Sequence, residues 1–346
     1  MATSRPLVSV IICVYNAGLY FRPSLLSILN QTYRELEILV VDDGSTDSAI
    51  QASVDLLRDP RVRLLEQPNR GKPAALNLAL EHVHGDFYAV HDADDISDPT
   101  RIAAQAQCLQ CNPDLAAVFC CNDLILHGRR MAPCVTFKDR RQCRREIDAF
   151  RTPAHDPTAM YRLSLVGHLR YDESLPILEG VDYILRVGEQ FPMMVLGQCL
   201  YGYRIHGESV TRRDPHRRAE LVRQTMQRAC ARRGLSYEQV FATDADQPAN
   251  ARRRRQRQFE DNYLAAHFLD SVWYLRSVGR SAEALWTGWQ CAKLHPLDPH
   301  YYKPLFCAAA PTALIERIRG RARRPAVAPH ARSADNVVGE MEAGDV

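Results

Sequence analysis

The first hundred residues alternate between short apolar runs and segments with helical spacing, and this alternation restricts the fold more than any other feature. The runs are rich in β-branched residues: VSVIICV (8–14), LEILVV (36–41), VRLLE (62–66) and FYAV (87–90). Helix-like segments lie between them at 21–33, 48–59 and 73–83. Strands that alternate with helices in this way build a parallel sheet. The sequence therefore predicts an α/β fold, which loosens after residue 100 into helices and shorter, antiparallel strands.

Polar and acidic residues follow these runs where each strand is expected to end. The first run ends in VYNAG (14–18), the second in VVDDGSTD (40–47) and the fourth in HDADD (91–95). Open α/β sheets bind their ligands at the carboxyl ends of the strands. Carboxylates crowded at such a place repel one another and cost free energy when partly buried, unless a positive charge lies among them. A divalent cation is one interpretation of HDADD, and a solvated turn with a helix cap is the other.

The remaining motifs exclude several classes of site. Neither G-x-G-x-x-G nor G-x-x-x-x-G-K-[ST] occurs after the first strand, which argues against dinucleotide and P-loop chemistry. An Asp-x-Asp at a strand end instead supplies the oxygen ligands that Mg²⁺ and Mn²⁺ prefer. The 11 cysteines show no complete zinc motif and are interpreted as thiols in a reducing cytosol. We see no signal-peptide pattern and no apolar run of bilayer length, and therefore expect a cytoplasmic protein.

Four motifs occur in an order that resembles the nucleotide-sugar-binding half of family 2 glycosyltransferases of the GT-A fold. They are VSVIICVYNAG, LEILVVDDGSTD, NRGKPAALNLAL and FYAVHDADD. The resemblance implies a Rossmann-like, mixed and mainly parallel sheet flanked by helices. The implied domain covers 1–211, with a nucleotide-binding half at 1–100 and an acceptor half at 101–211. Its implied activity is inverting, metal-dependent transfer of a sugar from a nucleotide diphosphate to a hydroxyl of a glycan, lipid-linked or protein-linked acceptor.

The resemblance also implies roles for the residues that bind the nucleotide. Tyr15 and Asp42 would contact the base, with Asn16 and Asp43 beside them. Lys72, in NRGKPAALN, would lie near the base or the phosphates. The implied donor is a UDP- or dTDP-linked sugar, since uracil and thymine present the same N3–H to Asp42.

The metal site implied by the resemblance lies in HDADD and in the later segment YRIHGESVT (203–211). Asp94 would be the main ligand of Mn²⁺ or Mg²⁺. Asp92 would reach the ribose or the metal, and His206 would complete the metal or phosphate site. A structural hydrogen bond is the alternative role for His206.

The segment PILEGVDYILRV (176–187) departs from the family pattern at the catalytic base. The family usually has a Glu-Asp pair at the start of a helix, followed by an Arg. Counting back from Arg186 places Glu179 at the Glu and Gly180 at the usual Asp. We predict Glu179 as the base that takes the acceptor proton, with Asp182 as the alternative. Gly180 also motivates a second hypothesis, a catalytically weak or inactive scaffold that binds a nucleotide sugar and associates with membrane.

After residue 211 the composition changes, with 13 Arg against 5 Asp or Glu between Thr211 and Arg257. We expect a helical extension over 212–320 and a disordered tail over 321–346. The aromatic residues of the extension, including Trp273, Trp286 and Trp289, lie near basic segments, which suits peripheral binding to the inner face of a membrane. They could instead fill a helical bundle or form a homodimer. No nucleic-acid-reading motif is present, so no nucleic-acid partner is predicted.

A haloacid-dehalogenase-type phosphotransferase is the alternative enzyme class, because DADDI (92–96) imitates its Asp-x-Asp motif. That class places the motif on the first strand of its domain. Here three candidate strands precede the motif, which counts against this alternative.

Overall fold

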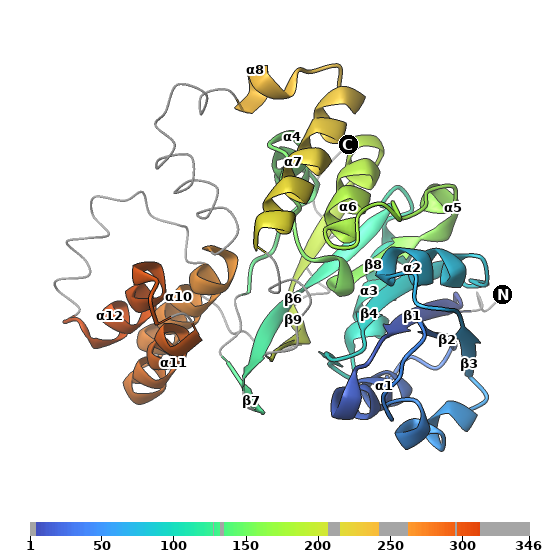
Figure 1. Cartoon of the computed structure of the whole chain (residues 1–346), viewed down its shortest axis with the longest axis horizontal. Helices are drawn as coiled ribbons and strands as arrows, with labels where there is room; N and C mark the ends of the chain where they lie inside the picture. The colour runs from blue at the N-terminus through green and yellow to red at the C-terminus, as the bar shows by residue number, and fades with distance from the viewer. Residues whose placement is uncertain are drawn as a thin grey trace, which may run out of the picture.

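The computed structural model describes residues 5–126, 128–131, 135–206, 215–241, 262–294 and 296–311 of the chain. A mixed sheet covered by helices forms the body of the molecule, and a group of C-terminal helices lies beside it (Figure 1). The predicted tail at 321–346 and the basic run Arg252–Arg255 lie outside the described residues.

The strands of the described residues form one nine-stranded sheet of order β3-β2-β1-β4-β8-β6-β9-β5, with β7 paired to β6. Their bounds are β1 Val8–Val14, β2 Leu36–Asp42, β3 Val62–Glu66, β4 Phe87–Asp92, β5 Ile96–Ser97, β6 Ala117–Leu126, β7 Arg129–Arg130, β8 Ala159–Arg162 and β9 Met193–Ile205. Strands β1 to β4 pair in parallel, and β8 runs antiparallel between β4 and β6. The predicted α/β fold with a mixed, mainly parallel sheet is confirmed.

Strands β6 and β9 differ from the expectation of short antiparallel pieces after residue 100. They are the longest strands described and pair with each other in parallel. The prediction was wrong here because the two strands are far apart in the sequence, and pairing at that separation leaves no local periodicity to recognise.

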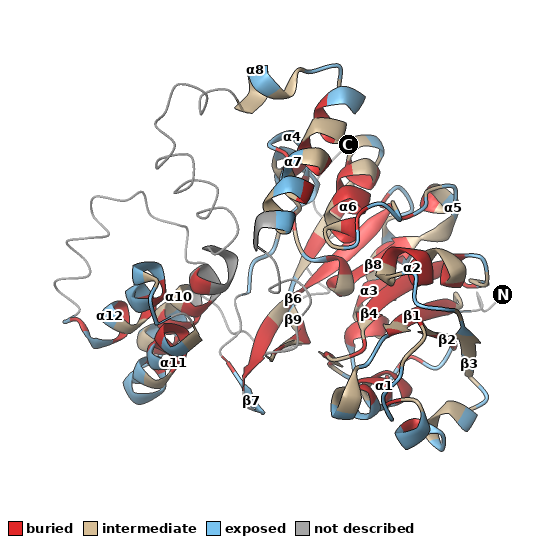
Figure 2. Cartoon of the chain, viewed as in Figure 1, coloured by how far each residue is buried: buried red, intermediate tan, exposed pale blue. Residues whose placement is uncertain are grey.

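The helices cover both faces of the sheet. Their bounds are α1 Phe21–Leu29, α2 Lys72–Leu80, α3 Arg101–Cys111, α4 Arg140–Asp148, α5 Leu163–Val166, α6 Glu179–Gln190, α7 Pro215–Arg232, α8 Tyr237–Phe241, α10 Asn262–Ser277, α11 Ser281–Leu294 and α12 Lys303–Ala309. Apolar residues of α1 and α3 pack with one face of the sheet, and those of α2 and α6 with the other. Figure 2 shows the strands between these layers as the most continuously buried part of the chain.

One expected helix, at 48–59, is replaced by two 3₁₀ turns at Gln51–Ser53 and Leu56–Arg58. Serine, valine and aspartate occur through this segment, and these residues have modest helix propensity. The segment buries Ala49 and Ser53 and leaves Val54 exposed, so little packing supports a longer helix.

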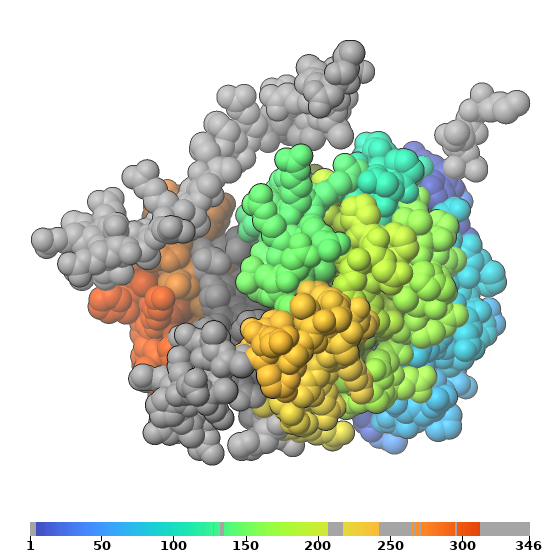
Figure 3. All heavy atoms as spheres, turned by 90° about the horizontal axis from the view of Figure 1, so that it is seen from above, coloured from blue at the N-terminus to red at the C-terminus, as the bar shows by residue number. Residues whose placement is uncertain are grey.

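Helix α7 shares a core with α6, through its buried residues Met226, Ala229 and Cys230. Figure 3 shows α7 and α8, in yellow and orange, lying directly against the green part of the chain. Helices α10 and α11 contact the sheet elsewhere, because Phe268 and Cys291 pack with residues of β6 and β9. The predicted boundary at residue 211 stays a prediction, and this packing favours a boundary after α8.

Two of the three tryptophans are half-buried within the C-terminal helices, whereas Trp289 is 52% exposed. Trp273 and Trp286 pack against the apolar clusters that α10 to α12 build. Among the described residues, every helix is too short or too polar to cross a membrane.

Candidate active site

The ends of β1, β2 and β4 bring the predicted site residues to one edge of the sheet. The parallel register pairs Val14 of β1 with Asp42 of β2, and Cys13 with Asp92 of β4. Because these strands run in the same direction, their terminal side chains and the loops that follow lie together at this edge.

Asn16 connects the loop after β1 to the loop after β2. Its backbone is in the left-handed region, with φ of 49°. Its side-chain Oδ1 accepts hydrogen bonds from the backbone N–H groups of Thr46 (2.7 Å) and Asp47 (3.2 Å). The amide of Asn16 therefore holds protein backbone, while the neighbouring Tyr15 keeps 49% of its surface exposed at the site.

Asp42 and Asp43 are adjacent in the sequence but have different surroundings. Asp43 is buried, and its carboxylate accepts hydrogen bonds from Gln67 Nε2 (2.7 Å) and from the backbone N–H groups of Arg70 and Gly71 (2.8 Å each). It therefore holds the loop that leads into α2. Asp42 is half-buried, and its Oδ1 accepts a hydrogen bond from Ser45 N (2.9 Å). Of the two, Asp42 is the one that can face a ligand.

Lys72 links the end of β4 to the start of α6. Its Nζ lies 2.6 Å from Asp92 Oδ1 and 3.5 Å from Glu179 Oε1. Burial alone would lower the pKa of the Lys72 amine, but the charges of Asp92 and Glu179 raise it well above its ordinary value. A permanent positive charge thus lies between the predicted nucleotide and catalytic carboxylates.

Three carboxylates after β4 form the acidic cluster Asp92, Asp94 and Asp95, with one oxygen of each within 4.8 Å of the others. Asp95 is fully buried, and it accepts hydrogen bonds from the Tyr201 hydroxyl (2.8 Å) and Arg204 N (2.7 Å). Burial, together with the charges of Asp94 and Asp92, raises the pKa of Asp95 well above its usual range. Asp95 therefore fastens this loop to β9.

His206 lies directly after β9 and contacts the acidic cluster. Its Nε2 is 2.7 Å from Asp94 Oδ2, and its ring lies 4.7 Å from that of Tyr20. In the described part of the chain, its buried Nδ1 has no hydrogen-bond partner. Among the described residues, the site thus combines three neighbouring carboxylates with an imidazole nitrogen that has no hydrogen-bond partner.

The acidic cluster fits a hard divalent cation. Mn²⁺ and Mg²⁺ prefer carboxylate oxygens and tolerate an imidazole nitrogen. Because the oxygens of Asp95 are used by β9, Asp94 and Asp92 are the carboxylates that could hold the ion, with His206 beside them. Bound there, the cation would neutralise the phosphate charge of a nucleotide.

Arg101 is a buried charge that sequence reasoning missed. It is completely buried, and its guanidinium donates to Ser97 Oγ (3.0 Å) and to the carbonyls of Val90 (3.0 Å) and Pro157 (2.8 Å). A basic residue in the first turn of a helix opposes the helix dipole, and that signal could have revealed it.

Arg101→Met is expected to destabilise the protein while preserving most of the side-chain stem. The carbonyls of Val90 and Pro157 would lose their donor, and each unpaired buried polar group costs about 1–3 kcal/mol. We expect the free energy of unfolding in urea to fall by about 3 kcal/mol or more. Exposed Arg63→Met, the matched control, should change it by less than about 0.5 kcal/mol. An equal effect of both variants would contradict the role of Arg101.

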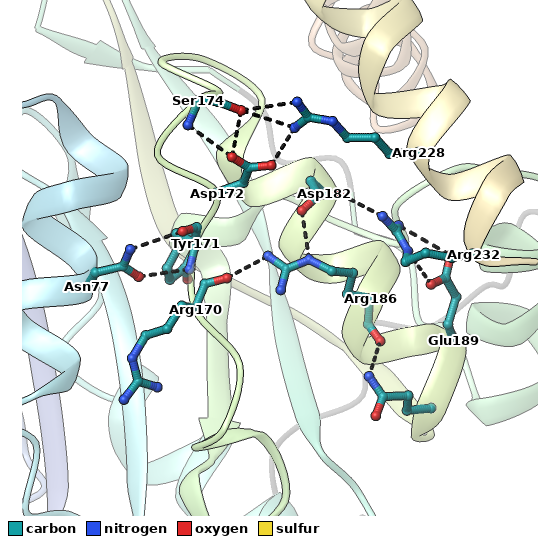
Figure 4. Close-up of polar contacts among 11 residues, drawn as sticks. Asn77, Arg170, Tyr171, Asp172, Ser174, Asp182, Arg186, Glu189, Arg228 and Arg232 are labelled. Atoms are coloured by element: carbon teal, nitrogen blue, oxygen red, sulfur yellow. Dashed lines mark hydrogen bonds and ion pairs between the residues drawn. The ribbon is translucent and has the colours of Figure 1, made fainter.

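The start of α6 carries both predicted bases in different environments. Glu179 is 9% exposed; burial raises the pKa of its carboxyl, and the charge of Lys72 offsets part of that rise. Asp182 is 2% exposed, and Figure 4 shows its carboxylate held by Arg186 (Nε, 2.7 Å) and by Arg232 of α7 (Nη1, 3.1 Å). Asp182 therefore joins α6 to α7, which favours Glu179 as the base.

A comparison with protein families matches residues 9–169 to the family described as glycosyl transferase family 2. Residues 9–169 form a family 2 glycosyltransferase domain. The predicted resemblance is confirmed, and the haloacid-dehalogenase alternative is left without support. Apart from Val8, the first residue of β1, the glycosyltransferase domain contains every strand from β1 to β8 and the whole acidic cluster.

Relatives of this chain occur in bacteria of different genera. The chain is 29% identical over 230 residues to an uncharacterized glycosyltransferase of Haemophilus influenzae, covering 63% of this chain and 71% of that protein. It is 38% identical over 106 residues to the glycosyltransferase GlyG of Streptococcus pneumoniae, covering 30% of this chain and 35% of GlyG. The chain thus spans less than half the length of some relatives.

Two solved structures share the fold. S. aureus TarS 1–349, in complex with UDP-GlcNAc, has a TM-score of 0.53 at 18% identity, covering 87% of this chain and 89% of that one. The mannosyltransferase PcManGT of Pyrobaculum calidifontis, in complex with GDP-Man and Mn²⁺, has a TM-score of 0.53 at 21% identity, covering 92% and 89%. At these identities the likeness confirms the GT-A fold.

Proposed function

We propose that the protein transfers a sugar from a nucleoside diphosphate to a hydroxyl group, with inversion at the sugar carbon. The observation that carries this proposal is Lys72, which joins the acidic cluster to Glu179 on one edge of the sheet. Asp42, which we propose as the carboxylate that binds the base, lies at the same edge. The two structural neighbours were solved in complex with UDP-GlcNAc and GDP-Man, which supports a nucleotide-sugar donor.

The donor would lie across the ends of β1, β2 and β4. Asp42 would accept the N3–H of uracil or thymine, and exposed Tyr15 would cover the ring. Asp94, Asp92 and His206 would hold Mn²⁺ or Mg²⁺, which supplies positive charge for the diphosphate. Asn16 and Asp43 would act indirectly, because they hold the loops that carry these groups.

The transfer itself needs one proton acceptor. The acceptor oxygen forms the bond to the sugar carbon as the bond from that carbon to the phosphate oxygen breaks. The nucleoside diphosphate leaves with the electron pair, and the proton of the acceptor hydroxyl passes to a carboxylate. We assign that carboxylate to Glu179, since the arginines around Asp182 occupy its oxygens.

The acceptor is proposed to be a glycan, a lipid-linked sugar or a protein-linked sugar at the inner face of a membrane. Exposed apolar residues on the C-terminal helices, among them Trp289 and Phe306, offer a surface for peripheral binding or for a homodimer. Replacing Arg252–Arg255 by alanine should weaken binding to anionic liposomes. Unchanged binding would argue against membrane association.

The test of the proposed function is thermal stabilisation by UDP, dTDP, GDP and CMP, each with and without Mn²⁺. A ligand that binds the folded state raises its stability according to affinity, by about 2.7 kcal/mol at a hundred times Kd. We expect UDP or dTDP to stabilise the protein only with Mn²⁺, and the corresponding sugar nucleotide to release the diphosphate. Stabilisation without turnover would instead support the inactive scaffold, and no stabilisation by any nucleotide would contradict both.

A further inference from the structure

Asp156 is a buried carboxylate beside the proposed base that the mechanism above does not use. It begins the 3₁₀ turn Asp156–Thr158 and is only 6% exposed. Its Oδ1 accepts a hydrogen bond from the Tyr161 hydroxyl (2.5 Å), and its Oδ2 from the Tyr171 hydroxyl (3.1 Å). The 3₁₀ turn leads directly into β8, and it contacts α6 near Gly180.

A side chain on residue 180 would collide with Asp156. A Cβ atom built on Gly180 lies 2.5 Å from Cβ of Asp156, 3.0 Å from its Cγ and 3.1 Å from its Oδ2. These separations are shorter than van der Waals contact, so the glycine is what leaves room for this carboxylate. Asp156 therefore places its carboxylate next to Glu179, in the volume that an aspartate at 180 would fill.

The charges around Asp156 come from three sides. Lys72 of α2 and Glu179 of α6 face it, and the hydroxyls of Tyr161 and Tyr171 donate to it. Asp92 lies beyond Lys72. Burial, together with the charge of Glu179, raises the pKa of Asp156 to about 6. The hydrogen bond from Tyr161 and the charge of Lys72 lower the same pKa in part. Two neighbouring carboxylates of this kind cannot both ionise freely, so the proton affinity of the pair increases.

We propose that Asp156 is a positioning residue for the base, a second carboxylate supplied from the turn before β8 in place of a side chain at residue 180. Its negative charge increases the proton affinity of Glu179, which takes the proton of the acceptor hydroxyl. This inference rests on the proposed function. Glycine occurs at position 180 because it leaves room for the carboxylate of Asp156.

Asp156→Asn tests the charge while preserving volume and an acceptor for Tyr161. The assay is release of nucleoside diphosphate from UDP-glucose, UDP-N-acetylglucosamine or GDP-mannose, with water as the acceptor. We expect kcat at pH 7.5 to fall about tenfold or more, with KM for the donor unchanged. The acidic limb of the kcat profile should move to lower pH, because Glu179 loses its negatively charged neighbour.

The same variant separates this role from a structural one. Burial raises the pKa of Asp156 from 3.8 to about 6, so the folded state binds more protons between these pH values. The contribution of Asp156 to the free energy of unfolding therefore decreases as pH rises from 3.8 to about 6. Above that range the ionised carboxylate destabilises the folded state. Asp156→Asn should consequently not lower the thermal midpoint at pH 7.5. A lower midpoint with an unchanged kcat profile would overturn the proposal in favour of a structural role.

Exchange of the two residues gives the sharpest test. Asp156→Gly alone should lower kcat and move the acidic limb of the kcat profile to lower pH. Asp156→Gly combined with Gly180→Asp returns a carboxylate to the same volume. We expect the exchange to recover at least tenfold in kcat over Asp156→Gly. Equal activity of the single and double variants would overturn the proposal.

A failure of the proposed function is distinguishable from a failure of this inference. If the wild type releases no diphosphate from any of the three donors, the proposed function fails. The coupling is then measured without turnover, from thermal midpoints of Asp156→Asn, Glu179→Gln and the double variant at pH 7.5. Non-additive effects of the two substitutions support the carboxylate pair, and additive effects overturn it.

Discussion

Asp94→Asn is expected to abolish stabilisation of the protein by nucleoside diphosphate and Mn²⁺. It should also lower donor turnover by about a thousandfold, because a metal contributes several kcal/mol of charge stabilisation and about 1.4 kcal/mol is tenfold in rate. Asp94 is singled out because Asp92 is paired with Lys72 and Asp95 with β9, whereas the Asp94 side chain is 31% exposed and touches His206. Thermal shift and diphosphate release measure the two effects.

The matched control for Asp94 is Asp55→Asn. Asp55 is an exposed carboxylate that pairs with Arg22 away from the acidic cluster. The Asp55→Asn variant should leave both the Mn²⁺-dependent thermal shift and the turnover unchanged. If Asp94→Asn retained a full Mn²⁺-dependent shift, the cluster would be a structural turn and not a metal site.

Glu179→Gln is expected to lower turnover, whereas Asp182→Asn is expected to lower the stability of the fold. Glu179→Gln should lower kcat by about 10²–10⁴ with little change in donor KM, because a proton acceptor is lost while binding is retained. Asp182→Asn should cost about 3–5 kcal/mol of unfolding free energy, since it removes one charge of a buried ion-pair network and leaves Arg186 without its carboxylate, while Arg232 keeps Glu189.

Diphosphate release per folded molecule and urea denaturation separate the two carboxylates. The turnover of folded Asp182→Asn should remain near that of the wild type. The reverse pattern, lost turnover in Asp182→Asn and normal turnover in Glu179→Gln, would assign the base to Asp182 and place its arginines in the mechanism.

Much of the nucleotide-binding half was predictable from the sequence. The strands β1, β2 and β4 are continuous apolar runs, as buried parallel strands require, and each ends at the residue where polarity begins. The acceptor half was less predictable. Strands β6 and β9 pair across a large sequence separation, and Arg101 is buried by segments that no local pattern connects.

The sequence alone therefore determined which residues gather at the carboxyl edge of the sheet, because strand period and strand ends are local properties. Only the tertiary structure decided what each carboxylate does there. Asp42 and Asp43 differ because the loop before α2 folds onto one of them, and Glu179 and Asp182 differ because α7 brings Arg232 to the second. The role of a carboxylate depends on its charged and hydrogen-bonding partners, and in this chain those partners come from distant segments.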